Sequence, residues 1–199
     1  MMIKSLGLNK YVELYRDFLH PNPIINSQAT LTLRKEFEVK FMANLIANLE
    51  EEDLFIRRKS ILALGLFGKK SLNSIVRLYM ETNSKNVKVS CLKTFVKVVV
   101  NCNLEQLTDE EMSVINLALQ DNEPEITLTV ISLLRQLGKT GRDILMKICR
   151  DKDLLRAKAS ISALLEMKDQ TVEDLFYELI NDTAIDPMIK EDIIRDKIF

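Results

Sequence analysis

Residues 45–68 read LIANLEEEDLFIRRKSILALGLFG, and this stretch contains the unit from which the fold can be predicted. Leu45 and Leu49 are spaced as on one face of an α-helix. An acidic turn at 51–53 separates them from a second apolar segment, which ends at Gly68. The stretch therefore predicts two short amphipathic helices joined by a polar turn.

The same pattern recurs along the 199 residues. Prolines mark the start of three second helices, because proline fits the first helical position: Pro23, Pro124 and Pro187. Each second helix then carries an equivalent apolar residue: Ile25, Ile56, Val87, Ile126, Leu155 and Ile189. The next position is mostly basic: Asn26, Arg57, Lys88, Thr127, Arg156 and Lys190. Small or apolar side chains four residues past the apolar one are expected to allow close packing: Ala29, Ser60, Cys91, Val130, Ala159 and Ile193.

The segments between pairs also follow the repeat. Four glycines are expected to lie at the ends of second helices: Gly65, Gly68, Gly138 and Gly141. One interval is longer than the others and predicts a loop from Asn101 to Asp109, with Thr108 capping the helix that follows.

A single amphipathic pair cannot bury its apolar faces, whereas stacked pairs bury a continuous core. The sequence therefore predicts an all-α fold, an α-solenoid (superhelix) of about six HEAT-like helix pairs. We expect one domain over 1–199, with repeats near 11–40, 41–70, 71–111, 112–141, 142–170 and 171–199.

The composition disfavours nucleic-acid and membrane partners. The chain has 28 Lys and Arg against 29 Asp and Glu, and a net charge of -1 gives no general attraction to phosphate or anionic lipid. No apolar run reaches the ~18 residues that a membrane span needs, and the first residues lack the character of a secretory signal. Three widely spaced cysteines suit a reducing compartment: Cys91, Cys102 and Cys149.

The sequence contains no self-contained catalytic motif. The stretch Gly138-Lys139-Thr140 resembles the end of a phosphate-binding loop, but it lacks the earlier glycine and a preceding strand. His20 is the only histidine, and we expect it to cap a helix or face solvent. A histidine-based metal site is therefore not predicted, and the catalytic residues stay unknown.

The recurring basic position supplies most of the candidate binding residues: Arg57, Lys88, Arg156 and Lys190. In one interpretation they pair with acids of neighbouring turns, such as Asp53 and Asp153, and form a ladder along the stack. In the other they line a cationic inner groove that binds an acidic partner or a carboxylate. Arg58 lies next to Arg57 and is expected to face outward, toward a partner.

Four segments resemble a known family, the HEAT-repeat phycobilin lyase superfamily, and within it the branch of the phycobilisome degradation protein. They are DLFIRRKSILALGLFG (53–68), NVKVSCLKTFVKVVVN (86–101), LQDNEP (119–124) and AIDPMIK (184–190). The chain departs from the family at Asn26 and Thr127, where a basic residue is expected.

The resemblance implies a protein that binds phycobiliprotein subunits and acts in bilin attachment, detachment or phycobilisome turnover. A phycobilin would be handled transiently, with no permanent cofactor, and the recurring basic side chains would approach its propionates. A protease and a second HEAT-repeat subunit are alternatives for a further partner. The implied compartment is a cyanobacterial cytoplasm or a plastid stroma. The alternative function is a HEAT-repeat scaffold or adaptor without chemistry.

Overall fold

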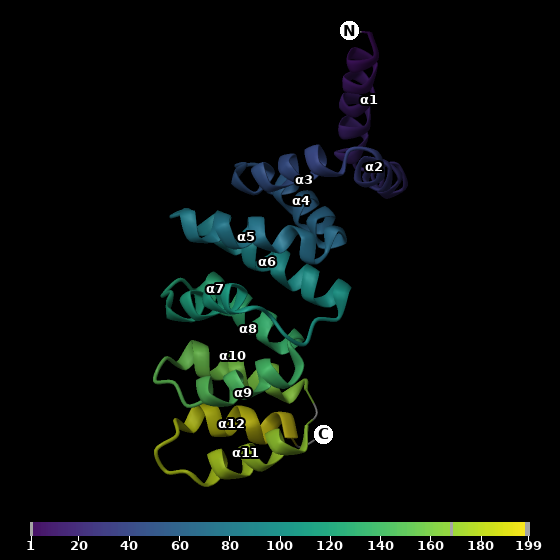
Figure 1. The fold of residues 1–199 in the computed structure, drawn as a ribbon. Coiled ribbons are helices and arrows are strands. Elements are labelled where there is room, and N and C mark those ends of the chain that lie inside the picture. The colour runs from purple at the N-terminus through teal and green to yellow at the C-terminus, as the bar shows by residue number, and fades with distance from the viewer. Residues whose placement is uncertain (1, 168, 198–199) are drawn as a thin grey trace. The chain divides into compact units, whose positions relative to one another are not determined.

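The computed structural model describes residues 2–167 and 169–197, and these residues are all-helical, without a strand (Figure 1). This confirms the predicted all-α class. The chain divides into two compact units, Met1–Cys102 (unit 1) and Asn103–Phe199 (unit 2). Unit 1 contains α1 (Met2–Phe18), α2 (Pro23–Glu36), α3 (Glu38–Ala47), a short 3-10 turn (Asn48–Glu50), α4 (Leu54–Phe67), α5 (Lys69–Glu81) and α6 (Lys85–Cys102). Unit 2 contains α7 (Asp109–Gln120), α8 (Pro124–Gln136), α9 (Gly138–Ile148), α10 (Leu154–Leu165), α11 (Gln170–Asn181) and α12 (Pro187–Lys197).

The helices form successive contacting pairs: α1/α2, α3/α4, α5/α6, α7/α8, α9/α10 and α11/α12. Two helices joined by a turn therefore recur along the described residues, and the acidic turn at 51–53 lies directly before α4. Three even-numbered helices also contact the next even-numbered helix: α4 contacts α6, α8 contacts α10, and α10 contacts α12. Each unit is thus a stack of helix pairs. A single solenoid domain over the whole chain stays a prediction.

The core of unit 1 centres on α4, which contacts α3, α5 and α6. One face of α4 is buried through Ile61, Leu64 and Phe67. Helix α6 contributes Leu92 and Phe95, both without exposed surface. Burying side chains of this size stabilises the fold by about 1.5–3 kcal/mol each. The face of α4 that carries Ile61, Leu64 and Phe67 is therefore buried, as its apolar periodicity predicts.

Two side-chain hydrogen bonds and an aromatic cluster join the first two pairs of unit 1. The rings of Phe18 and Phe41 meet edge to face, with centroids 5.2 Å apart. The Asn48 amide donates to the hydroxyl oxygens of Tyr15 at 2.7 Å and Ser60 at 2.8 Å. These bonds satisfy the buried amide group of Asn48 and connect α1, the 3-10 turn and α4.

In unit 2, ion pairs connect successive helix pairs around an apolar core. Arg142 on α9 pairs with Asp169 at 2.6 Å, and Arg150 pairs with Asp182 at 3.1 Å. Ion pairs at a protein surface are screened by water and contribute little to stability. The stability of unit 2 must therefore come mainly from its fully buried side chains: Ile115, Leu133, Leu134, Leu145, Leu164 and Leu179.

Backbone hydrogen bonds give the true register of the second helices. In every pair, the carbonyl of the residue just before the second helix accepts a hydrogen bond from a backbone N–H of that helix. The donors are the N–H groups of Asn26, Arg57, Lys88, Thr127, Ala157 and Lys190. The predicted register was therefore wrong by one residue in the fifth pair, where Ala157, not Arg156, is the equivalent. The reason is that Arg156 occupies the position that is apolar in the other pairs, so the apolar residue was assigned to Leu155, one residue too early. The predicted packed position is buried in all six pairs once Ser160 replaces Ala159.

Two of the four glycines lie where one helix follows another. Gly68 ends α4 as predicted, whereas Gly138 is the first residue of α9; their φ values of 61° and 53° belong to a conformation that favours glycine. The prediction was wrong for the other two, because Gly65 lies inside α4 and Gly141 inside α9. The predicted loop is shorter than expected, because α6 continues to Cys102. Thr108 caps α7 as predicted.

Candidate functional site

Arg57 lies on α4, and its guanidinium is bound to its own turn. Its Nη1 donates to the backbone carbonyls of Glu51 at 2.6 Å and Glu52 at 2.8 Å. Asn26 and Thr127, at the same repeat position, likewise donate to the carbonyl six residues earlier, from His20 and Asp121. The repeat position therefore holds the turn between the two helices of a pair, and a polar side chain suffices for this.

The other predicted residues divide between the units. In unit 1, Arg58 is exposed on α4, and the Lys88 ammonium lies 5.9 Å from the centroid of the Tyr79 ring. In unit 2, Lys190 is half-buried on α12. Arg156 donates to the carbonyl of Asp121, in the preceding turn, at 2.8 Å. Arg156 therefore connects neighbouring turns through a backbone carbonyl, whereas the ladder interpretation invoked acidic side chains.

A groove in unit 1 is the candidate binding site. Its volume is about 410 Å³, and it lies along α2, α4 and α6. Three leucines form its apolar floor, and their exposed fractions are 60% for Leu31, 52% for Leu62 and 43% for Leu66. The volume lies within the range of ligand pockets, about 300–1,000 Å³. We call it the unit 1 groove; its lining residues are Phe18, Asn26, Ser27, Thr30, Leu31, Lys59, Leu62, Ala63, Leu66, Lys97 and Asn101.

The charge around this groove is positive. Lys59 on α4 and Lys97 on α6 line it, and none of the described lining residues carries a carboxylate. The sequences of α2, α4 and α6 contain one acidic residue, Glu36, whose carboxylate pairs with Lys10 at 2.5 Å. The basic residues of the three helices are Arg34, Lys35, Arg57, Arg58, Lys59, Lys85, Lys88, Lys93 and Lys97. The chain as a whole has a net charge of -1, but α2, α4 and α6 of unit 1 are strongly cationic.

Gly65 determines how closely α6 approaches α4 at this groove. A Cβ atom at Gly65 would lie 2.8 Å from the Cβ of Lys97 and 3.1 Å from the side-chain nitrogen of Asn101. Glycine inside a helix costs about 0.5–1 kcal/mol relative to alanine. Its presence therefore indicates that the close approach matters, and this approach places Lys97 and Asn101 at the edge of the groove.

Unit 2 has a similar groove with different electrostatics. It has a volume of about 490 Å³ and includes Leu128, Leu155 and Leu165 in its lining. Its two cations share one carboxylate, because Asp192 pairs with Lys158 at 2.8 Å and with Arg195 at 3.0 Å. The hydrogen bond from Lys158 lowers the pKa of Asp192, so this carboxylate stays ionised. The positive charge of the unit 2 groove is therefore compensated locally.

The described residues offer little for metal or acid–base chemistry. They contain no group of three or more His, Cys, Asp or Glu side chains that could hold a metal ion. The Nδ1 atom of His20 accepts a hydrogen bond from the backbone N–H of Asn22 at 3.0 Å, which agrees with its predicted structural role. None of the described helices has both the length and the apolar character needed to cross a membrane.

The thiols are expected to differ sharply in reactivity. Burial raises the pKa of Cys91 to about 12 and that of Cys149 to about 11, whereas Cys102 is exposed. Because the thiolate is the reactive form, the two buried thiols stay protonated and inert at pH 8, and a pH near 11 would be needed to ionise Cys149 and one near 12 to ionise Cys91. Iodoacetamide should therefore modify Cys102 alone in the native protein, and all three after unfolding in guanidinium, as counted by mass spectrometry. Modification of Cys91 or Cys149 in the folded state would contradict this assignment.

Sequence reasoning missed Lys59, Lys97 and the three leucines of the unit 1 groove. The signal was present in α4, which has apolar residues around most of its circumference. A helix of this kind buries or offers a second face. The position of Lys97 carried no such signal, because only the packing of α6 on α4 brings it to the groove.

The chain is similar to two proteins from cyanobacteria. Over 169 residues it is 26% identical to the bilin biosynthesis protein CpeZ of Synechococcus sp. (strain WH8020), which covers 82% of this chain and 91% of that protein. Over 178 residues it is 24% identical to the uncharacterized phycocyanin operon protein Z of Pseudanabaena tenuis (strain PCC 7409), covering 89% of this chain and 88% of that protein. No protein-family model matches the chain. The names confirm the predicted resemblance to phycobilin-related proteins, while the degradation branch stays a prediction.

Proposed function

We propose that this protein acts in the attachment of a phycobilin to a phycobiliprotein, and that the cationic helices of unit 1 bind the client. The name of one relative, a bilin biosynthesis protein, supports a role in the formation of these pigments rather than in their breakdown, and the name of the other refers to a phycocyanin operon. The observation that carries the proposal is the unit 1 groove, where Lys59 and Lys97 stand without a lining carboxylate.

The chemistry of the client fits this groove. A phycobilin is a linear tetrapyrrole with propionate side chains, so a client that carries it presents both apolar surface and carboxylates. Charge-assisted hydrogen bonds from lysine to carboxylate are roughly twice as strong as neutral ones. The exposed leucines would cover the apolar part, and Arg58 adds a further cation beside Lys59 on α4.

Other parts of the prediction remain proposals. The repeated helix pairs support a HEAT-type solenoid over 1–199. Phycobilin would be bound transiently, in a cyanobacterial cytoplasm or a plastid stroma. Lys88, Arg156 and Lys190 are retained as predicted contacts, although Arg57 and Arg156 donate to turn carbonyls and are better placed to hold the turns.

A capture experiment tests this function. Immobilised protein is incubated with phycobilisome extract, and the visible absorption of the eluate is recorded. We expect coloured subunits to be retained by the native protein. The charge reversals Lys59→Glu and Lys97→Glu together should reduce capture at least about tenfold, because attraction to the client carboxylates becomes repulsion.

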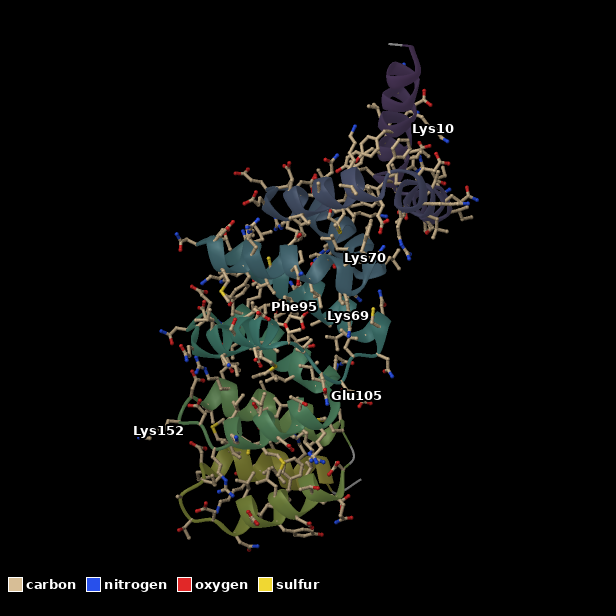
Figure 2. The ribbon with its side chains drawn as sticks, viewed as in Figure 1. Lys10, Lys69, Lys70, Phe95, Glu105 and Lys152 are labelled. Atoms are coloured by element: carbon tan, nitrogen blue, oxygen red, sulfur yellow. The ribbon has the colours of Figure 1, made fainter. Side chains whose placement is uncertain are left out.

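The matched control carries the same change of charge elsewhere. Lys139 and Lys152 are exposed in unit 2, and Lys152 projects away from the helices (Figure 2). Lys139→Glu with Lys152→Glu should leave capture unchanged. Equal loss in both double variants, or a colourless eluate from folded native protein, would refute the proposal. Captured pigment with an unshifted spectrum would favour the adaptor alternative, since bilin chemistry changes the absorption.

A further inference from the structure

Helix α4 has a second apolar face that no described helix covers. Its first face is buried in the core of unit 1 through Ile61, Leu64 and Phe67. On the other side, Leu62 and Leu66 are 52% and 43% exposed and lie four residues apart, one above the other on the helix. Exposed leucines in a row, beside the 60% exposed Leu31 of α2, form an apolar strip rather than scattered surface residues.

Cations border this strip, and the part of its lining that the structure describes contains no carboxylate. Lys59 precedes Leu62 by about one helical turn on α4, and Lys97 stands on α6. The lining also contains the amide side chains of Asn26 and Asn101 and the hydroxyl groups of Ser27 and Thr30. A complementary surface must therefore be apolar along its centre and negatively charged along its sides.

We propose that the unit 1 groove binds an acidic amphipathic α-helix of a protein partner. The apolar stripe of that helix packs on Leu31, Leu62 and Leu66, and its carboxylates pair with Lys59 and Lys97. Helices bind grooves in this way through residues at i, i+3, i+4 and i+7, which share one face. That the partner is a phycobiliprotein rests on the proposed function. That the groove binds an acidic helix is inferred from the groove itself.

The observations favour a protein helix over a nucleic acid. A phosphate backbone would satisfy Lys59 and Lys97 but would leave the exposed leucines against a charged surface. Single-stranded nucleic acids also need aromatic side chains on which bases stack. The one aromatic lining residue, Phe18, is 1% exposed and is packed in the core.

Gly65 acts as a positioning residue for this groove. The missing side chain lets Lys97 and Asn101 approach α4, and an alanine would push both away. Gly65→Ala keeps every charge and every leucine of the groove. It therefore tests whether the spacing between α4 and α6 is part of the recognition.

The test uses synthetic peptides and the full-length protein. The probe is a fluorescein-labelled, alanine-rich helical peptide of about 20 residues with leucines at helical spacing and glutamates on both sides. A second peptide has lysines in place of the glutamates, and a third has the acidic sequence in scrambled order. Binding is measured by fluorescence anisotropy, and circular dichroism confirms that each protein variant is folded.

We expect the acidic helix to bind at least about tenfold more tightly than the scrambled and lysine peptides. Leu62→Ser with Leu66→Ser should weaken it by about tenfold, and Gly65→Ala by a smaller factor. Lys59→Glu with Lys97→Glu should reverse the preference, so that the lysine peptide now binds better. This reversal cannot arise from loss of folding, because a binding activity is gained.

Three results would overturn the inference. The first is equal affinity for the acidic and scrambled peptides. The second is that Lys59→Glu with Lys97→Glu does not reverse the preference between the acidic and lysine peptides. The third is that a random DNA duplex binds more tightly than the acidic peptide and that the same double variant no longer binds this duplex. The outcome is separable from the proposed function. Peptide binding without capture of coloured subunits would refute the function alone, and capture that excess acidic peptide does not reduce would refute the helix site alone.

Discussion

Replacing Phe95 with alanine is expected to lower the free energy of unfolding by about 3–5 kcal/mol. Phe95 is fully buried on α6, the helix that contacts both α4 and α5 (Figure 2). Truncation removes the burial of an aromatic ring and leaves a cavity that the surrounding helices cannot fill without shifting. Urea denaturation followed by circular dichroism measures the effect.

The position of the damage can be checked by hydrogen exchange. Amides of α4, α5 and α6 should lose protection, because local stability depends on the contacts within a cooperative unit. Val100→Ala is the matched control, since Val100 lies on the same helix but is 51% exposed, and it should change stability by about 0.5 kcal/mol or less. Similar losses in both variants would show that α6 does not carry the core of unit 1.

Replacing Gly141 with alanine is expected to destabilise unit 2 by at least about 3 kcal/mol, because the added atom overpacks the joint between α8 and α9. A Cβ at Gly141 would lie 1.7 Å from the carbonyl oxygen of Leu134 and 2.6 Å from its carbonyl carbon. Both are backbone atoms, so no side-chain rotation relieves the clash. In unit 1 the corresponding residue is Ser71, whose hydroxyl bonds the Leu64 carbonyl at 3.3 Å, so that joint accommodates a side chain.

The nearby Gly138 provides the control for Gly141. It has a φ of 53°, and a Cβ there would meet no atom within 4 Å. Gly138→Ala should therefore lower the free energy of unfolding by only about 1–2 kcal/mol, because a residue with a side chain is strained in the left-handed conformation. Thermal unfolding of both variants gives the comparison. Gly141→Ala as stable as Gly138→Ala would mean that α8 and α9 separate without cost.

Much of the fold was predictable because its signals are local. Proline at the first helical position and a polar residue just before it are read from adjacent residues, as at Asn22 and Pro23, where the Asn22 side chain accepts from the N–H of Ile24 at 2.9 Å. The register of the fifth pair failed where that local signal is interrupted. Arg156 takes the apolar position and reaches the preceding turn, a contact that depends on the stacking of two pairs.

The candidate site was less predictable than the fold. The recurring basic position was found by periodicity, but periodicity cannot distinguish a side chain that holds a turn from one that faces a ligand. Arg57 belongs to the first kind, through the carbonyls of Glu51 and Glu52. Lys59, two residues later, lines the groove. The difference is the direction in which each side chain leaves the helix after the neighbouring helices have packed.

The sequence by itself determined that this chain forms pairs of amphipathic helices, where each pair turns, and that its segments resemble phycobilin-handling proteins. These properties follow from the spacing and type of residues that are close along the chain. Only the tertiary structure decided that Leu31, Leu62 and Leu66 share one groove with Lys59 and Lys97. The reason is physical: residues of α2, α4 and α6 line the groove only after the helices have packed, Gly65 sets how closely α6 approaches α4, and no local pattern encodes which surfaces that packing leaves uncovered.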